Sequence, residues 1–277
     1  MFPIIDCHCH IYPDKIAEKA AQGIGKFYNI GMQYDGKATT LYAENVKHGI
    51  THSLIFSVAT KPQQTQSINN FIAEKVASDR SSFTGLGTLH PDTEELDSDI
   101  EHIINLDLRG VKLHPDFQCV ALDDKRCYNI FEKCQGRLPV LLHTGDIRYD
   151  YSNPNRLKKV LKDFPNLTVI GAHFGGYSVW DDAVKNLGEF DNFYVDCSSS
   201  LAFMSTQKAQ SLVDFYGAQK IIFGTDFPMW NFGEELLRFN ALNLDEEQKS
   251  LIFYKNACKL FGIDQTLILK KFANSKK

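Results

Sequence analysis

Histidines gather at the ends of short apolar runs in this sequence. Six of the nine histidines stand at or just after the end of a run that is typical of a buried strand: His8, His10, His90, His114, His143 and His173. Asp226 follows a further run in the same way. Imidazole nitrogens and a carboxylate oxygen are ligands of zinc and of other first-row metals. The set therefore predicts a divalent-metal site.

The first of these runs carries a His-x-His pair. His8 and His10 are two residues apart, so on a strand both imidazoles point to the same face and can bind one ion. Asp6 shares that face and either orients one imidazole through a hydrogen bond or simply begins the strand. Cys7 and Cys9 then face the opposite side, where we expect them to pack in the core. The seven cysteines include no CxxC pair, which favours reduced thiols over a disulfide framework.

A metal at this place would supply Lewis-acid chemistry. An ion with an open coordination position lowers the pKa of a water molecule towards about 7, which makes hydroxide available at neutral pH. We expect Asp226 both to ligate the ion and to accept the proton of that water. The ligands suit zinc, iron, manganese or nickel; we expect one zinc ion, with two ions as the alternative. Each histidine alone is also compatible with an ordinary hydrogen-bonded residue, and only their joint occurrence favours the metal.

The segments that must position these residues alternate between short apolar runs and longer amphipathic stretches. The expected strands are Pro3–His8, His52–Val58, Phe83–Leu89, Arg109–His114, Pro139–His143, Leu167–His173, Asn192–Asp196 and Lys220–Thr225. The expected helices include Gln66–Ala77, Glu94–Leu106, Tyr128–Gln135, Pro154–Phe164, Val179–Leu187 and Thr206–Tyr216. Eight strand–helix units predict an α/β fold, a closed parallel (β/α)8 TIM barrel whose strand ends meet at one mouth. An open doubly wound sheet is the alternative, but no Gly-rich phosphate loop follows the first run.

The 277 residues show no linker, so we expect a single domain over residues 1–277. The segment from Tyr12 to Lys37 does not follow the alternation. We interpret it as an insertion after the first strand, a long loop with a helix near Asp14–Ala21 that lies over the mouth. Near the end of the chain, Gly262 is expected to terminate a last helix that contains Asn256–Phe261.

Composition excludes several classes of protein. The residues are 43% hydrophobic and 23% charged, with a net charge of −4 and scattered basic residues, so we expect no nucleic-acid partner. The apolar stretches are far shorter than the roughly 20 residues that cross a bilayer. The segment Met1–Asp6 lacks the pattern of a secretory signal, so a cytoplasmic address is expected. A small-molecule substrate is the expected partner, and a homodimer is possible.

Five short motifs, in order along the chain, resemble those of the amidohydrolase superfamily. The resemblance is to its short-chain branch of barrel-type metal-dependent hydrolases, which includes aminocarboxymuconate-semialdehyde decarboxylase and the dihydroxybenzoate decarboxylases. It extends from the first strand to the eighth. The motifs are Ile5-Asp6-Cys7-His8-Cys9-His10, Gly110-Val111-Lys112-Leu113-His114-Pro115, Pro139-Val140-Leu141-Leu142-His143-Thr144-Gly145, Ala172-His173-Phe174-Gly175-Gly176 and Ile222-Phe223-Gly224-Thr225-Asp226-Phe227-Pro228.

The resemblance assigns roles to five residues. It implies that His8 and His10 are the ligand pair of the first strand and that His143 is the ligand of the fifth. Asp226 matches the ligand and proton acceptor of the eighth strand. His173 matches the histidine of the sixth strand, which contacts the water or substrate when one metal is bound and ligates the second metal when two are bound.

Other residues near the expected strand ends have less certain roles. The resemblance allows Lys112 to be a carboxylated lysine that bridges two metals. The residue type also fits a cation that pairs with a substrate carboxylate, or a lysine with a buried stem at the rim. His114 shares the face of Lys112 and is a candidate substrate contact. Arg148, Tyr177 and Trp230 follow strands, so they either line the pocket or pack locally.

These observations favour a metal-dependent hydrolase that attacks the carbonyl of an amide, lactone or ester. In that hypothesis, Asp226 takes the proton of the water, and His173 stabilises the oxyanion or transfers a proton. The alternative is a non-oxidative decarboxylase of an aromatic or unsaturated acid. A third hypothesis, a non-catalytic metal or ligand binder, predicts that the general base is missing, whereas Asp226 is present.

Overall fold

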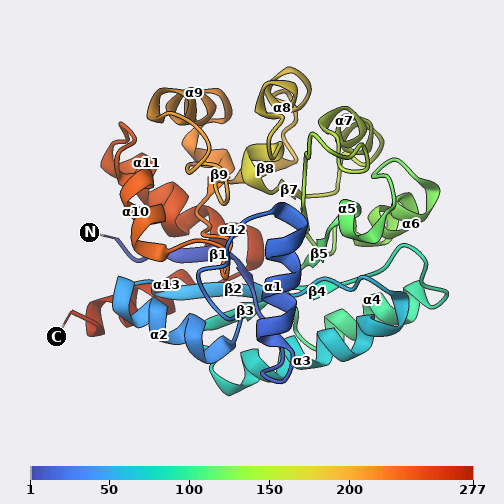
Figure 1. Ribbon diagram of the computed structural model, residues 1–277, viewed down its shortest axis with the longest axis horizontal. Coiled ribbons are helices and arrows are strands. Elements are labelled where there is room, and N and C mark those ends of the chain that lie inside the picture. Colours follow the sequence, from blue (N-terminus) through green and yellow to red (C-terminus); the bar gives the residue numbers. More distant parts are fainter. Residues whose placement is uncertain (1, 277) are drawn as a thin grey trace.

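The strands form a closed parallel barrel. In the computed structural model, which describes residues 2–276, nine strand segments follow one another around the barrel (Figure 1). They are β1 (Ile5–His10), β2 (His52–Phe56), β3 (Phe83–Gly85), β4 (Gly87–Thr88), β5 (Val111–Leu113), β6 (Val140–Leu142), β7 (Val169–Gly171), β8 (Phe193–Asp196) and β9 (Ile221–Ile222). β3 and β4 are two halves of one barrel strand, because only Leu86 separates them, so the predicted (β/α)8 fold is confirmed.

The barrel closes between its first and last strands. The backbone N–H of Cys7 donates to the carbonyl of Phe223 at 2.9 Å, and that of His10 donates to the carbonyl of Phe227 at 2.8 Å. The segment after β9 therefore lies directly beside β1. This contact brings Asp226, which is in that segment, next to the His-x-His pair.

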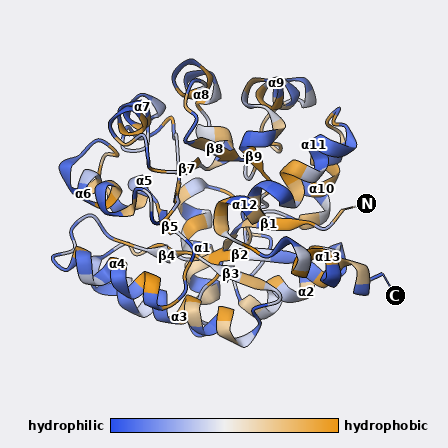
Figure 2. Cartoon of the chain, turned by 180° about the vertical axis from the view of Figure 1, so that it is seen from behind, coloured by the Kyte–Doolittle hydropathy of each residue, from blue (hydrophilic) through white to orange (hydrophobic). Residues whose placement is uncertain are grey.

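The core lies inside the barrel and between the barrel and its helices. Every residue of β1 is buried, as are all those of β2, β5, β6 and β7. The helices have one apolar side; in α7 (Pro154–Asp163) it consists of Leu157, Val160 and Leu161, which recur at helical spacing. Figure 2 shows this division as hydrophobic strands in the centre and helices with a hydrophilic outer side.

The helices surround the barrel (Figure 1). Six lie within three residues of their predicted bounds: α3 (Thr65–Ser78), α4 (Leu96–Asn105), α6 (Lys125–Cys134), α7, α8 (Trp180–Leu187) and α9 (Thr206–Tyr216). Those without a stated prediction are α2 (Ala38–His48), α5 (Pro115–Gln118), α10 (Phe232–Asn240), α11 (Glu246–Ser250) and α13 (Gln265–Asn274). The predicted helix before Gly262 is α12 (Asn256–Phe261), which ends at Gly262 in the left-handed region with a φ of 62°, but it is not the last helix, because α13 follows it. Within residues 2–276, none of the helices has the length and hydrophobicity needed to cross a membrane.

The helix expected over the barrel mouth is present but displaced along the chain. α1 spans Ala17–Tyr28 instead of Asp14–Ala21, and it crosses the middle of the ring of helices (Figure 1). It ends at Asn29, whose φ of 55° lets its N–H reach the last carbonyls of the helix. The prediction stopped too early because Gly23 and Gly25 are unfavourable inside a helix. Gly25 is required by packing, since a Cβ there would lie 2.7 Å from the carbonyl oxygen of Ile30.

Candidate metal centre

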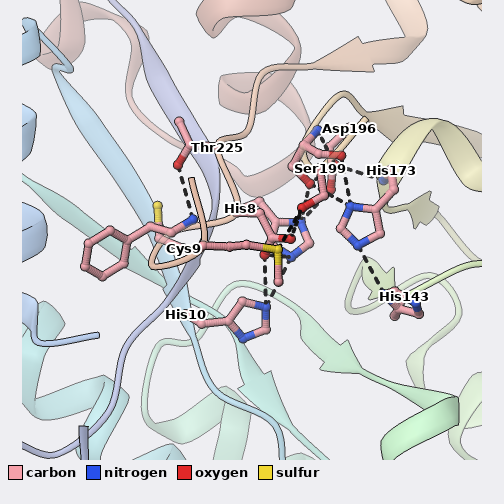
Figure 3. A network of polar contacts seen from close by, with 12 residues as sticks. His8, Cys9, His10, His143, His173, Asp196, Ser199 and Thr225 are labelled. Carbon is pink, nitrogen blue, oxygen red and sulfur yellow. Dashed lines mark hydrogen bonds and ion pairs between the residues drawn. The ribbon is translucent and has the colours of Figure 1, made fainter. Parts of the chain in front are cut away.

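Three of the four predicted ligands form one group at the barrel mouth. Nε2 of His8 and Nε2 of His10 face each other at 3.2 Å. Oδ1 of Asp226 lies 3.4 Å from the first nitrogen and 3.7 Å from the second. Figure 3 shows the imidazoles of His8 and His10, both from β1, turned towards each other. Two imidazole nitrogens and one carboxylate oxygen at these distances are a plausible donor set for a divalent ion.

Asp196, at the end of β8, orients His8. Its Oδ2 lies 2.8 Å from Nδ1 of His8, so it accepts the proton of that nitrogen and leaves the lone pair on Nε2. Its Oδ1 accepts from the backbone N–H groups of His173 and Ser198, both at 3.0 Å. Of the two roles left open for Asp6, orienting an imidazole is not the one that the structure shows. Asp6 instead accepts from the backbone N–H of His8 and, at 2.6 Å, from the hydroxyl of Thr225.

Asp226 is held by its own backbone conformation and by a hydroxyl. Its φ of 62° is in the left-handed region, which turns the side chain back towards β1. Oδ2 of Asp226 accepts a hydrogen bond from the hydroxyl of Ser199, and the indole N–H of Trp230 donates to that hydroxyl at 2.7 Å. Oδ1 is therefore directed to the histidines while Oδ2 is fixed by Ser199.

His143 and His173 form a second pair beside the first group. Nδ1 of His143 faces Nε2 of His173 at 3.1 Å. Nδ1 of His173 lies 3.0 Å from the carbonyl oxygen of Ser198, so it donates there and Nε2 carries the lone pair. Nε2 of His143 lies 3.6 Å from Oδ2 of Asp116. The ring of His173 is 5.1 Å from that of His8 and 4.9 Å from that of His143, so it links the two groups.

The site keeps its histidines neutral, which is the form that binds metals. Burial lowers the pKa of His8, His10 and His143 well below the ordinary value, and it lowers that of His173 to about 4. Cys7 and Cys9 are buried in the core, as expected from the alternation. The group of His8, His10 and Asp226 therefore fits a divalent ion, because its imidazoles are neutral and Asp196 leaves the lone pair of His8 on Nε2. His143 is outside the group of three, so its role as fourth ligand stays a prediction.

Lys112 and His114 line the same small pocket as the histidines. Lys112 is fully buried, and its Nζ has no hydrogen-bond partner among the described residues; burial lowers its pKa to about 8. His114 stacks between Phe117, at 3.7 Å, and His143, at 4.0 Å between ring centroids. The Lys112 ammonium is therefore available to form hydrogen bonds with a substrate, whereas both faces of the His114 ring are covered by other rings.

α1 closes this pocket from above. The hydroxyl of Tyr28 lies 2.9 Å from Nε2 of His114 and 3.4 Å from Nε2 of His143. Arg148 fixes this end of the helix: its Nη1 donates to the carbonyl of Phe27, and its guanidinium lies 4.7 Å from the centroid of the Phe27 ring. The same guanidinium forms a two-pronged ion pair with the buried carboxylate of Asp146.

Comparison with known families identifies the chain. The model of the amidohydrolase family matches residues 5–263. The chain belongs to the amidohydrolase family. The predicted resemblance to that superfamily is thereby confirmed, whereas the reaction and the metal are separate questions.

Solved structures share the fold of this amidohydrolase. An uncharacterized TIM-barrel protein from Bordetella bronchiseptica is 19% identical with a TM-score of 0.78, covering 98% of this chain and all of the other. A dihydroxybenzoic acid decarboxylase from Polaromonas sp. JS666, with bound manganese, is 18% identical with a TM-score of 0.74, covering 97% and 99%. A putative 2-pyrone-4,6-dicarboxylic acid hydrolase from Pseudomonas putida is 19% identical with a TM-score of 0.66, covering 95% and 99%. Among curated proteins, no match is found.

In this amidohydrolase, sequence reasoning missed several residues that shape the site. Asp196 ends the predicted strand Asn192–Asp196, so the strand-end logic that selected the histidines also applied to it. Ser199 and Tyr28 carried no such signal, because neither stands at the end of a predicted strand. Of the three loop residues left open, Tyr177 lines the pocket, Trp230 supports Ser199, and Arg148 fixes α1.

Proposed function

We propose that this chain is a metal-dependent hydrolase of a small-molecule amide, lactone or ester. The observation that carries the proposal is the placement of Asp226. Oδ1 of Asp226 lies against the His8–His10 pair, and Oδ2 is held by Ser199. One carboxylate is thus positioned both to ligate an ion and to accept a proton from a water beside it.

The ion would be held by His8, His10 and Asp226, with His143 as the expected fourth ligand. When bound, a divalent ion there activates water and polarises a carbonyl. We propose zinc because nitrogen ligands with one carboxylate suit it; manganese is the alternative, and elemental analysis of purified protein decides between them. The same measurement counts one ion or two, and the electron density at Lys112 in a crystal structure shows whether that residue is carboxylated.

The other residues of the pocket would manage protons and charge. Asp226 accepts a proton at its carboxylate. His173 carries its lone pair on Nε2, because Nδ1 donates to Ser198, so it can take up and return a proton at Nε2. The ammonium of Lys112 lies over the Phe56 ring at 5.3 Å but has no hydrogen-bond partner in the described structure, so it is positioned to stabilise negative charge that develops on the substrate.

Replacing Asp226 by asparagine tests the proposal. The variant keeps the size of the side chain but cannot take up a proton, so kcat/KM for a panel of esters and lactones is expected to fall by about 10²–10⁴-fold. Elemental analysis should still find the metal. Asp191→Asn, at an exposed position outside the site, is the control and should remain fully active. Full activity of the Asp226→Asn protein would contradict the proposed role.

A decarboxylase of an aromatic or unsaturated acid is the second candidate. The unpaired, buried Nζ of Lys112 favours it, because an ammonium in the pocket can bind the carboxylate of an acid substrate. The Polaromonas neighbour has this type of activity by its name. Release of carbon dioxide from a panel of hydroxybenzoates, with no hydrolysis of esters or lactones, would select this candidate. A metal-loaded protein that acts on none of these compounds would favour a non-catalytic binder.

A further inference from the structure

A second cavity adjoins the metal centre. The pocket at the centre has a volume of only about 30 Å³, which is room for about two water molecules. The second cavity, of about 500 Å³, lies between α1, the segment after β2 and α3. A volume of this size is within the range of about 300–1,000 Å³ that is usual for ligand sites. The organic part of a substrate therefore fits the second cavity and not the first.

The two cavities share one wall. His10, Ile24 and Phe117 line both of them. Nε2 of His10 points towards the metal centre, and other atoms of His10 border the second cavity. The tail of a molecule whose carbonyl lies at the His8–His10 pair would therefore reach the larger space beside Ile24 and Phe117.

The lining of the second cavity is apolar. α1 contributes Ala20 and Phe27, the turn before it contributes Ile16, and α3 contributes Ile68 and Phe71. Among the described residues, no aspartate, glutamate, lysine or arginine lines it. A charged group placed there would lose its hydration without gaining a partner.

The polar groups of the lining are mostly engaged with the protein. The hydroxyl of Ser57 donates to the carbonyl of Ile11. Oε1 of Gln64 accepts from the backbone N–H of Thr60 at 2.9 Å and from that of Lys61 at 3.1 Å. Hydrogen bonds in this cavity therefore add little to the binding free energy of a ligand, which comes mainly from the burial of apolar surface.

We propose that the second cavity holds an uncharged, apolar tail of the substrate while the carbonyl reacts at the metal centre. This inference rests on the proposed function, which it makes more specific: the substrate class is an ester, lactone or amide with an aliphatic or aromatic tail. A substrate whose tail ends in a carboxylate is excluded from the cavity, because no basic residue in the described lining would receive it.

Binding of alkyl hydroxamic acids to the zinc-loaded protein, measured by calorimetry, tests the inference without requiring turnover. The head group chelates the metal and the tail extends from it, so a series from acetohydroxamic to octanohydroxamic acid probes the cavity directly. Affinity should rise by up to about fourfold for each buried methylene. An eight-carbon hydroxamic acid whose tail ends in a carboxylate should bind at least about tenfold more weakly than octanohydroxamic acid.

Matched variants of α1 locate the tail. Ala20→Trp fills the cavity and should remove most of the gain with chain length while leaving the affinity for acetohydroxamic acid unchanged. Lys19→Trp places the same side chain at an exposed neighbouring position outside the lining. In this control, affinity should still increase with chain length. Gly23 offers a second pair, because it lines the cavity and an added Cβ meets nothing within 4 Å. Gly23→Leu should remove most of the increase in affinity with chain length, as Ala20→Trp does. Gly23→Ala should keep that increase, as the wild type does.

The outcomes separate the inference from the proposed function. A wild-type protein that binds no member of the series, that binds all members equally, or whose gain survives both filling variants overturns the inference. If the gain with chain length is observed and no ester, lactone or amide is hydrolysed, the cavity assignment holds and the hydrolase proposal alone fails.

Discussion

At the scale of the residue, the direction of the imidazole lone pairs determines the chemistry. His8 and His10 face each other through Nε2 at 3.2 Å, and His143 and His173 face each other at 3.1 Å. Asp196 and the carbonyl of Ser198 take the proton of the opposite nitrogen of His8 and of His173. Nε2 of His8 and Nε2 of His173 therefore each present a lone pair, which is available to a cation or to a proton on the facing ring.

Replacing Asp196 by asparagine tests this dependence on the neighbouring hydrogen bonds. The asparagine has no charge to favour the proton on Nδ1 of His8, and its amide NH₂ would oppose the backbone N–H groups of His173 and Ser198. Partners of this kind contribute about 10–100-fold to metal affinity, and we expect a loss of that size in a competition titration with a chelator. Asp214→Asn, at an exposed position on α9, should leave the affinity unchanged, and equal affinity of both variants would contradict the role of Asp196.

The sequence predicts part of this site because a strand has a simple period. Alternation alone places His8 and His10 on one face, and the position after an apolar run selects His173 and Asp226. Alternation does not reveal that His173, Ser199 and Asp226 adopt the left-handed region, with φ values of 61°, 45° and 62°. These turns direct side chains in ways that depend on tertiary contacts, so the partners of the ligands could not be derived from spacing.

At the scale of the element, α1 shows why the mouth was harder to predict than the barrel. The barrel helices have an apolar side that packs on strands, so their periodic pattern predicts them closely. α1 instead borders both the metal centre and the second cavity, and only Ala17, Ala21 and Gly25 are buried in it. Its position depends on Tyr28 and Arg148, which contact residues distant in the sequence.

Removing the guanidinium of Arg148 should loosen the end of α1. The test uses the double variant Asp146→Asn/Arg148→Ala, because removing Arg148 alone would leave the buried carboxylate of Asp146 without its ion-pair partner. The single variant Asp146→Asn is the control. The double variant loses the hydrogen bond to Phe27 and the stacking of the guanidinium, which together contribute about 1–3 kcal/mol. We expect amide hydrogens of residues 24–28 to exchange at least about tenfold faster than in the control, measured by mass spectrometry. Equal exchange in the two proteins would show that other contacts fix the helix.

At the scale of the whole molecule, the metal centre lies where the barrel closes. The ligands His8 and His10 are on the first strand, and Asp226 follows the last one. Only a few backbone hydrogen bonds join these two edges, among them those from Cys7 and His10. An ion held by residues of both edges would therefore act as an additional link in the closure and should stabilise the fold as a whole.

Metal removal is therefore expected to lower the thermal stability of the entire barrel and not only the activity. An ion present at about 100 times its Kd stabilises the folded state by about 2.7 kcal/mol, which corresponds to a shift of about 5–10 °C in the Tm of a protein of this size. Calorimetry before and after treatment with EDTA, followed by addition of zinc, should show this loss and its recovery. His10→Ala should abolish the response, whereas His102→Ala, which replaces a histidine of α4 outside the site, should retain it. A Tm that does not change with metal in the wild-type protein would mean that the ligands do not join the two edges of the barrel through an ion.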